Sequence, residues 1–335
     1  MESVSESEKS AGRIKATTTQ VNNITVNNIN FTQMKKILLL AAVLIASFAT
    51  NTQAQILYRI SGKGLESPSY IVGTYHLAPS SFADSIPGIK TAIEETQQVC
   101  GELDMMDAFK PENAARLMKA QMLPEGVTLS SLFTAEQLER LNALLLEVMG
   151  SNLKDEAFAA QVDNMTPVAL STTLTLTSYM KEIPSFNPMD LIDNYFQTLA
   201  LQNGKSVKGF ETVDFQMGVL YDIPLEKQVD DLMCLVDNFE DAQKMASRIT
   251  TAYFTQNLQQ IGEVLEEESE MNCGASDEEE ETLIYNRNRN WVDMMPEMMA
   301  EQPTLYVVGA AHLCGEKGVL KLLEKAGYTV EGMKE

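Results

Sequence analysis

The chain is poor in basic residues and has no long apolar run. Its 335 residues carry 25 Lys and Arg against 47 Asp and Glu, a formal net charge of −22. Because so acidic a surface repels phosphate backbones and anionic lipid, we expect no nucleic-acid partner. The longest apolar run, residues 37–49, has about 13 residues, whereas a transmembrane helix needs roughly 20. We therefore expect no membrane span in the mature chain.

Residues 34–54, MKKILLLAAVLIASFATNTQA, have the anatomy of a secretory signal peptide. Lys35 and Lys36 precede the apolar run, and the small residues Thr52 and Ala54 precede Gln55 at a cleavage-like site. A buried helix is the alternative. The pattern predicts an exported protein, periplasmic or secreted. We expect the polar residues 1–33 to be a start-site artefact, with a disordered leader as the alternative.

Cysteine is scarce, and all four copies lie in the predicted mature part, 55–335. They are Cys100, Cys234, Cys273 and Cys314. An oxidising compartment permits disulfides, but four cysteines allow three pairings and sequence does not choose among them. We favour a bond between Cys234 and Cys273.

The order of patterns along the mature chain predicts an α/β fold. Strand patterns occur at 56–61, 69–76, 98–105, 205–212, 304–312 and 328–333, and helical patterns at 86–97, 213–267, 281–302 and 315–326. We expect one domain, 55–335, with a central mixed sheet built from both chain ends. A large helical insertion occupies about 107–204. The acidic stretch at about 263–281 is expected to be a solvated loop, with a low-affinity cation-binding surface as the alternative.

Histidine occurs only twice, and both copies end a G-x-x-H tetrad, at 73–76 and 309–312. Each tetrad closes a strand pattern and is followed by Leu, a turn and a helix pattern, so the two segments look like copies of one unit. Crevices at the carboxyl ends of strands are where α/β sheets place their sites. His76 and His312 together could bind a metal ion or act as acid and base. Two unrelated structural histidines are the alternative.

These motifs resemble the TraB/GumN family, which includes the Tiki metalloproteases and is distantly related to erythromycin-esterase-like proteins. The resemblance extends over about 57–332. His76 and His312 match the two motif histidines. Glu102 matches the family's acidic residue after the second strand, and Glu211 matches the glutamate of its L-E-T motif, with Phe210 in place of Leu.

The family's R-N-x-x-W helix is matched by Arg287, Asn288 and Trp291. Asn286 stands where the family usually has Glu, so a role for that preceding acid is not carried over. The resemblance implies that Arg287 stabilises an oxyanion or clamps a substrate carboxylate.

The resemblance to the Tiki proteins also implies a metal site, in which His76, His312 and one or both of Glu102 and Glu211 hold a divalent ion. A mixed imidazole and carboxylate set suits Zn, Mn or Co, and Tiki proteins are associated with Mn or Co. No organic cofactor is expected. The implied function is an exported, metal-dependent hydrolase that acts on an amide or ester bond of a peptide or small molecule. Two alternatives are a non-catalytic binding protein of the pheromone-shutdown kind and a metal-independent esterase with histidine as general base.

The two remaining cysteines lie close in sequence to residues of the matched site. Cys100 lies two residues before Glu102, and Cys314 lies two residues after His312. If Glu102 and His312 share a site, we expect a disulfide between Cys100 and Cys314 that braces it. Thiolate ligation and the absence of a bond are the alternatives.

Overall fold

A computed structural model describes residues 55–270 and 273–334. All of these lie in one compact unit, Thr52–Glu335. The predicted leader and signal peptide, at 1–54, lie outside the described residues. Among the described residues, no helix is both long and apolar enough to cross a membrane.

Six strands form one mixed sheet in the order β4-β3-β5-β2-β1-β6. They are β1 (Leu57–Ser61), β2 (Ser69–Thr74), β3 (Gln98–Leu103), β4 (Ser206–Glu211), β5 (Thr304–Gly309) and β6 (Thr329–Gly332). Strands β4, β3, β5 and β2 are parallel, and β1 is antiparallel to both β2 and β6. Because β5 lies between β3 and β2, the two chain ends interleave at the sheet centre, which confirms the predicted mixed α/β sheet.

The two G-x-x-H segments are neighbouring copies of one strand-turn-helix unit. Strand β2 leads into a 3-10 helix, η1 (Ser80–Ser85), and helix α2 (Ile89–Glu95), whereas β5 leads into η3 (Ala310–Leu313) and α16 (Val319–Lys325). Thr74 pairs with Gly309 in the register of β2 and β5. A Cβ at Gly73 would lie 3.0 Å from the Leu313 side chain and 3.1 Å from Ala310. Glycine there allows the first unit to pack closely against the second.

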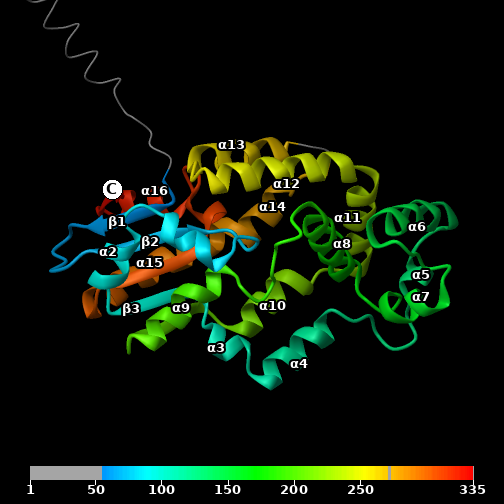
Figure 1. Cartoon of the computed structure of the whole chain (residues 1–335), viewed down its shortest axis with the longest axis horizontal. Coiled ribbons are helices and arrows are strands. Elements are labelled where there is room, and N and C mark those ends of the chain that lie inside the picture. The colour runs from blue at the N-terminus through cyan, green and yellow to red at the C-terminus, as the bar shows by residue number, and fades with distance from the viewer. Residues whose placement is uncertain (1–54, 271–272, 335) are drawn as a thin grey trace, which may run out of the picture. The chain divides into compact units, whose positions relative to one another are not determined.

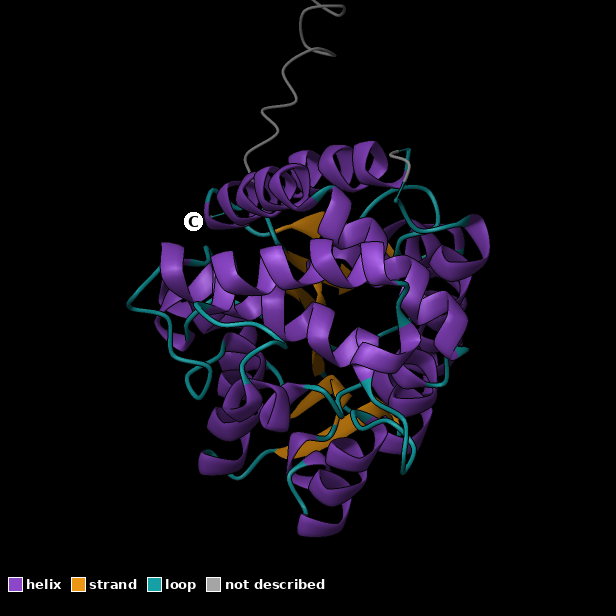
Figure 2. Ribbon diagram, turned by 90° about the vertical axis from the view of Figure 1, so that its right-hand side faces the viewer, coloured by secondary structure: helices purple, strands orange, loops and turns teal. Residues whose placement is uncertain are grey.

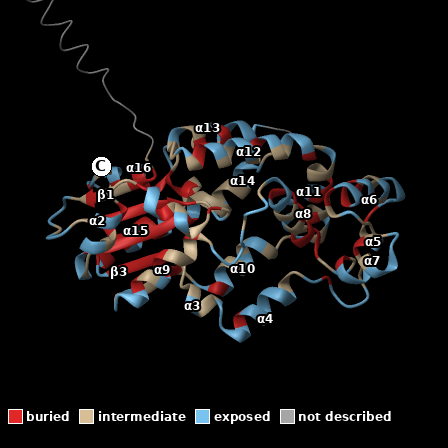
Figure 3. Cartoon of the chain, in the orientation of Figure 1, coloured by how far each residue is buried: buried red, intermediate tan, exposed pale blue. Residues whose placement is uncertain are grey.

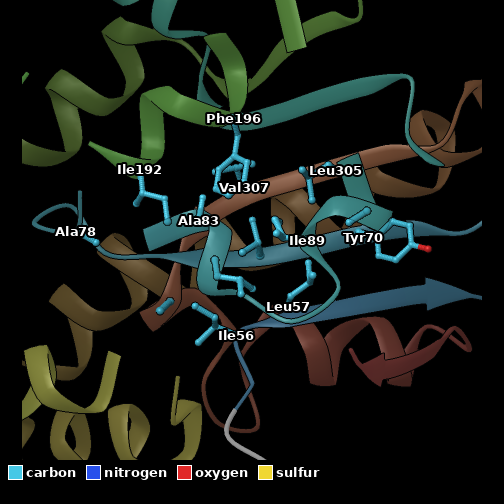
Figure 4. Packing of buried hydrophobic residues seen from close by; sticks show 14 of the residues in the cluster. Ile56, Leu57, Tyr70, Ala78, Ala83, Ile89, Ile192, Phe196, Leu305 and Val307 are labelled. Atoms are coloured by element: carbon cyan, nitrogen blue, oxygen red, sulfur yellow. The ribbon is translucent and has the colours of Figure 1, made fainter. Parts of the chain in front are cut away.

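Each face of the sheet is covered by its own helices. One face packs against α2, α9 (Ile192–Gln202), α12 (Phe239–Phe254) and α13 (Leu258–Ser269), through buried residues such as Leu305, Phe196 and Val307 (Figure 4). The other face packs against α15 (Asn286–Glu301) and α16, through Tyr306, Trp291 and Leu323. In Figure 1, α15 runs alongside the strands. The side view in Figure 2 shows the strands enclosed by helices.

A separate hydrophobic core lies among the helices between β3 and β4, together with α11 after β4. The helices between β3 and β4, apart from α9, are α3 (Met105–Ala108), α4 (Pro111–Ala120), α5 (Leu129–Leu132), α6 (Ala135–Met149), α7 (Glu156–Val162) and α8 (Pro167–Glu182), and α10 (Val213–Tyr221) and α11 (Leu225–Asp237) follow β4. The core itself is formed mainly by α5, α6, α8 and α11. The colours of Figure 3 show buried residues in these helices apart from those of the sheet. The helical insertion predicted from sequence is therefore present.

The prediction of a loop at 263–281 is wrong for most of that stretch. Helix α13 continues to Ser269, and a short helix, α14 (Asp277–Glu280), precedes a π-helical turn, η2 (Glu281–Tyr285). The helical apolar spacing of Ile261, Val264 and Leu265 explains α13, because Ile261 and Leu265 pack into the sheet-facing core and Val264 is also buried, while the acids face solvent.

Cys234 and Cys273 form a disulfide with a Cα–Cα distance of 5.7 Å, as predicted. The predicted bond between Cys100 and Cys314 is wrong, because both are free thiols. Cys100 is buried on the α15 face of the sheet, whereas Cys314 packs with the core on the opposite face, beside Leu258 and Gly262 of α13. The 3-10 turn that contains His312 carries the chain to that other face, so nearness in sequence to His312 does not bring Cys314 near Cys100.

Candidate functional site

The four predicted acidic and imidazole residues follow four adjacent parallel strands at one edge of the sheet. Glu211 ends β4, Glu102 lies near the end of β3, His312 follows β5, and His76 follows β2. Because parallel strands end at the same edge, the fold gathers residues that lie up to 236 positions apart in sequence. This edge is where open α/β sheets place their ligands.

Arg287, in the first turn of α15, contacts three of these four residues. Its Nε and Nη2 donate to Glu211 Oε1 and Oε2 at 2.8 and 2.9 Å, and Nη2 also donates to Glu102 Oε2 at 2.6 Å. Its Nη1 donates to the Leu283 carbonyl at 2.9 Å, in the π-helical turn, and lies 3.2 Å from His312 Nε2. All five guanidinium N–H groups therefore have partners within the protein.

Glu211 is fully occupied by hydrogen bonds. In addition to Arg287, Trp291 Nε1 donates to its Oε1 at 2.9 Å and Gln216 Nε2 donates to its Oε2 at 3.1 Å. The side chain is 6% exposed. These bonds favour a role in holding Arg287 over direct metal ligation.

His312 is a neutral imidazole whose tautomer is set by its neighbours. Asn288 Nδ2 donates to the Lys317 carbonyl at 3.0 Å, which turns Asn288 Oδ1 toward His312 Nδ1 at 2.6 Å. Nδ1 therefore carries the proton, and Nε2 keeps its lone pair and faces Arg287. Burial, reinforced by the positive charge of Arg287, lowers the pKa of His312 to about 4.

Glu102 lies between Arg287 and the segment of Gly309 and His312. Its Oε1 accepts a hydrogen bond of 2.8 Å from the Gly309 N–H and lies 3.8 Å from His312 Nε2. Burial acts to raise the pKa of Glu102, but the positive charges of Arg287 and His76 and the hydrogen bond from the Gly309 N–H outweigh it, so this pKa lies below its usual value. Glu102 is therefore a carboxylate at neutral pH.

His76 lies at the exposed rim of the site. Its Nδ1 is 3.2 Å from Asp193 Oδ2, and Thr74 Oγ1 donates to Asp193 Oδ1 at 2.5 Å. The His76 side chain is 73% exposed and that of Asp193 is 23% exposed. The hydrogen bond to Asp193 and its negative charge raise the pKa of His76 to about 9. The charges of Glu102 and Arg287 also act on His76, although no direct bond joins it to either.

The structure thus brings Glu102, Glu211, Arg287 and His312 into direct contact and leaves His76 at their edge. Asp193 and Gln216 are contact residues that the sequence did not predict. Asp193 is one of 47 acidic residues, lies 117 positions from its partner His76, and belongs to no local motif.

The charges of the cluster suit a bound cation. The carboxylates Glu102, Glu211 and Asp193 outnumber the one permanent cation, Arg287, and the low pKa of His312 keeps it neutral. In the absence of any other cation, protonated His76 supplies part of the missing positive charge.

The donor atoms also suit a divalent metal ion. Glu102 Oε1 and His312 Nε2, which are 3.8 Å apart, are the two donors that would hold such an ion, with Nε2 giving up its contact with Arg287 Nη1. Across residues 55–270 and 273–334, no three His, Cys, Asp or Glu side chains stand close enough to hold a metal together. A third protein ligand therefore requires a side chain to turn toward this pair.

Several curated proteins are similar to the chain in sequence. "Metalloprotease TIKI homolog" of Amphimedon queenslandica is 22% identical over 322 residues, which cover 83% of this chain and 61% of that protein. The protein of the same description from Nematostella vectensis is 22% identical over 315 residues, covering 80% and 65%. "Metalloprotease TIKI1" of Danio rerio is 23% identical over 308 residues, covering 79% and 61%.

The chain thus spans 61–65% of the length of these relatives. No solved structure matches it. The TraB/PrgY/gumN family model matches residues 56–332, nearly all of the part that the structure describes, and the chain belongs to this family.

Proposed function

We propose that the protein is an exported, metal-dependent hydrolase that cleaves an amide or ester bond, with a peptide as the preferred substrate class. The observation that carries this proposal is the Glu102–His312 pair at the carboxyl edge of the sheet, with donor atoms 3.8 Å apart beside an excess of carboxylates. The names of the similar proteins from sponge, sea anemone and zebrafish support peptide cleavage.

The ligands that we propose are His312, Glu102 and His76. His312 offers the lone pair on Nε2, Glu102 is ionised, and the exposed His76 side chain has room to turn toward them. When bound, a divalent ion such as Zn, Mn or Co lowers the pKa of a bound water and polarises the substrate carbonyl. Glu211 holds Arg287 in place, which keeps a positive charge beside Glu102.

The burial of the cluster defines how a substrate reaches it. The side chains of Glu102, Arg287 and His312 are at most 16% exposed, whereas His76 is 73% exposed. A substrate must therefore approach over His76. Because its Nδ1 proton is held by Asn288, Nε2 is the His312 nitrogen that carries the lone pair.

The test is elemental analysis of the purified protein starting at Gln55, beside His76→Ala and His312→Ala. We expect about one equivalent of metal in the parent protein after loading with Mn, Co or Zn, and loss in both variants. Peptide hydrolysis should follow the metal content. A parent protein that binds no metal even after loading would overturn the metal part of the proposal, and a peptide that binds without being cleaved would favour a binding protein. Sequencing of the amino terminus of the exported protein tests the signal peptide.

A second candidate is metal-independent hydrolysis by the two histidines. It is favoured by their opposite pKa shifts, with His76 raised to about 9 and His312 lowered to about 4. Such a separation is typical of acid and base partners, with protonated His76 as the acid and neutral His312 as the base. Hydrolysis that persists in a chelator, with no metal in the protein, would identify this mechanism.

A further inference from the structure

Helix α9 forms hydrogen bonds both with His76 and with the backbone that follows Glu102. Asp193, in its first turn, binds His76 Nδ1 beyond the end of β2. Gln197, four residues later and so on the same face of the helix, donates from Nε2 to the Leu103 carbonyl at 2.8 Å, and its Oε1 accepts from the Met105 N–H at 2.9 Å. These two backbone groups lie one and three residues after Glu102, so one helix bonds to the residues that follow β2 and to the end of β3.

Helix α9 is itself fixed, by a backbone bond to the loop after His76 and by packing against the sheet. The Ile192 N–H donates to the Ala78 carbonyl at 3.0 Å, which ties the start of α9 to the loop after His76. Ile192, Phe196 and Ala200 are buried in the core against the sheet. The side chain of Gln197 packs where a Cβ at Gly101 would collide with it, so glycine in β3 makes room for this contact.

The two histidines of the site are anchored in the same way by different groups. His312 Nδ1 faces Asn288 Oδ1 at 2.6 Å, and His76 Nδ1 faces Asp193 Oδ2 at 3.2 Å. In the His76 ring Nε2 is the nitrogen left for a ligand or substrate, whereas His312 Nε2 faces Arg287 Nη1 at 3.2 Å. A histidine ligand whose second nitrogen donates to a carboxylate is held in one orientation, and loss of such a partner typically costs 10- to 100-fold in metal affinity.

We propose that Asp193 is a positioning residue that fixes the ring of His76 with Nε2 directed to the site, and that α9 sets the spacing between His76 and Glu102 through Asp193 and Gln197. Asp193 is well suited to this, because its two oxygens hold Thr74 and His76, at alternate positions of the same segment. In the described part of the chain, the exposed imidazole has no other hydrogen bond or ion pair. The part of this inference that concerns metal affinity rests on the proposed function.

The first experiment needs no metal and no substrate. Because the protein has only two histidines, the Nδ1–H signals of His76 and His312 can each be followed in a nitrogen-15-labelled protein. We expect Asp193→Ala to speed solvent exchange of the His76 signal until it is lost, while the His312 signal remains and reports that the rest of the site is folded. Asp193→Asn, which keeps an acceptor oxygen, should retain part of the His76 signal. Asp190→Ala, which removes a nearby exposed charge, should leave both signals unchanged.

The second experiment measures the affinity of the metal-free protein for Zn²⁺ alone by calorimetry. We expect Asp193→Ala to weaken binding by about 10- to 100-fold, Asp193→Asn less, and Asp190→Ala not at all. An unchanged His76 signal in Asp193→Ala would overturn the inference, as would an unchanged Zn²⁺ affinity in a parent protein that binds the ion. If the parent protein binds no Zn²⁺, the proposed function fails at that point, while the exchange experiment still decides whether Asp193 holds His76.

Discussion

Arg287 and Glu211 meet side by side, with Nε donating to Oε1 at 2.8 Å and Nη2 donating to Oε2 at 2.9 Å. Their side chains are 9% and 6% exposed. This bidentate pair joins the first turn of α15 to the end of β4, and it fixes the guanidinium that also contacts Glu102 and His312. The orientation of the whole cluster thus depends on a glutamate that needs no contact with a substrate.

Glu211→Gln should therefore destabilise the protein, because it leaves the buried Arg287 without its bidentate counter-charge. Breaking a buried ion pair in this way typically costs about 3–5 kcal/mol in the free energy of unfolding. The matched control is Glu301→Gln, which breaks an exposed pair of 3.0 Å with Lys208 on the same strand and should cost less than about 1 kcal/mol. Urea unfolding of both variants measures the difference. Equal effects would contradict the role assigned to Glu211.

The free and bonded cysteines give a second prediction. In the unfolded, unreduced protein, a thiol reagent should find two thiols, and after reduction it should find four, because only Cys234 and Cys273 are bonded. In the folded protein Cys100 should not react, since it is fully buried and burial raises the pKa of its thiol well above the usual value. If no thiol reacted before reduction, the result would show that Cys100 and Cys314 form a disulfide after all.

Breaking the Cys234–Cys273 bond should also weaken the helical part. The two residues are 39 positions apart, and closing a loop of that length stabilises a fold by up to about 4 kcal/mol through the unfolded state. The double variant Cys234→Ala with Cys273→Ala should lower the unfolding free energy by a few kcal/mol. The control is Cys314→Ala, which removes a half-buried free thiol. A double variant as stable as the parent would show that the bond contributes nothing.

Much of the fold could be predicted from sequence because its signals are local. Strand patterns and the repeated G-x-x-H unit located β2 and β5 and placed His76 and His312 at strand ends. Arg287 and Glu102 required the family resemblance, since neither stands out in an acidic chain. Asp193 could not be predicted, because its role depends on the packing of α9 against the sheet, which brings its side chain to Thr74 and His76 and which no pattern near residue 193 records.

The two wrong predictions, a loop at 263–281 and a Cys100–Cys314 bond, also have physical causes. A run of acids looks like a loop, but Ile261 and Val264 are enough to bury one side of α13 and leave its glutamates in water. The predicted Cys100–Cys314 bond assumed that residues near a shared site share a face, whereas the turn after β5 sends Cys314 to the opposite face of the sheet.

Glu279 gives a prediction about acid stability. Its hydrogen bond to Lys227 and its capping bond to Ser276 lower its pKa from 4.5 to about 2. A lowered carboxyl pKa stabilises the folded state above pH 4.5, and this contribution is lost as the pH falls toward 2. Glu279→Gln should therefore be less stable than the parent at pH 7, by about 1 kcal/mol because the group is a third exposed, and the difference should vanish near pH 2.

The control for that experiment is Glu278→Gln, which removes a charge from the same helix turn at a fully exposed position. Its effect on stability should be smaller than that of Glu279→Gln. Unfolding free energies by urea at pH 7 and pH 3 measure both variants. A pH dependence that is the same in Glu279→Gln as in the parent would contradict the assignment of the low pKa to this residue.

The single tryptophan offers a direct report on the proposed metal site. The ring of Trp291 is 1% exposed, and its centre lies 4.4 Å from the centre of the His312 imidazole. Because Co²⁺ has unpaired electrons, its binding at His312 Nε2 should quench Trp291 emission, with saturation near one equivalent. His312→Ala should abolish the quenching, whereas Asp190→Ala should leave it unchanged. Binding of Co²⁺ by the parent protein without a change in emission would place the ion away from His312, and the carboxyl edge of the sheet would then have to be a site without a metal.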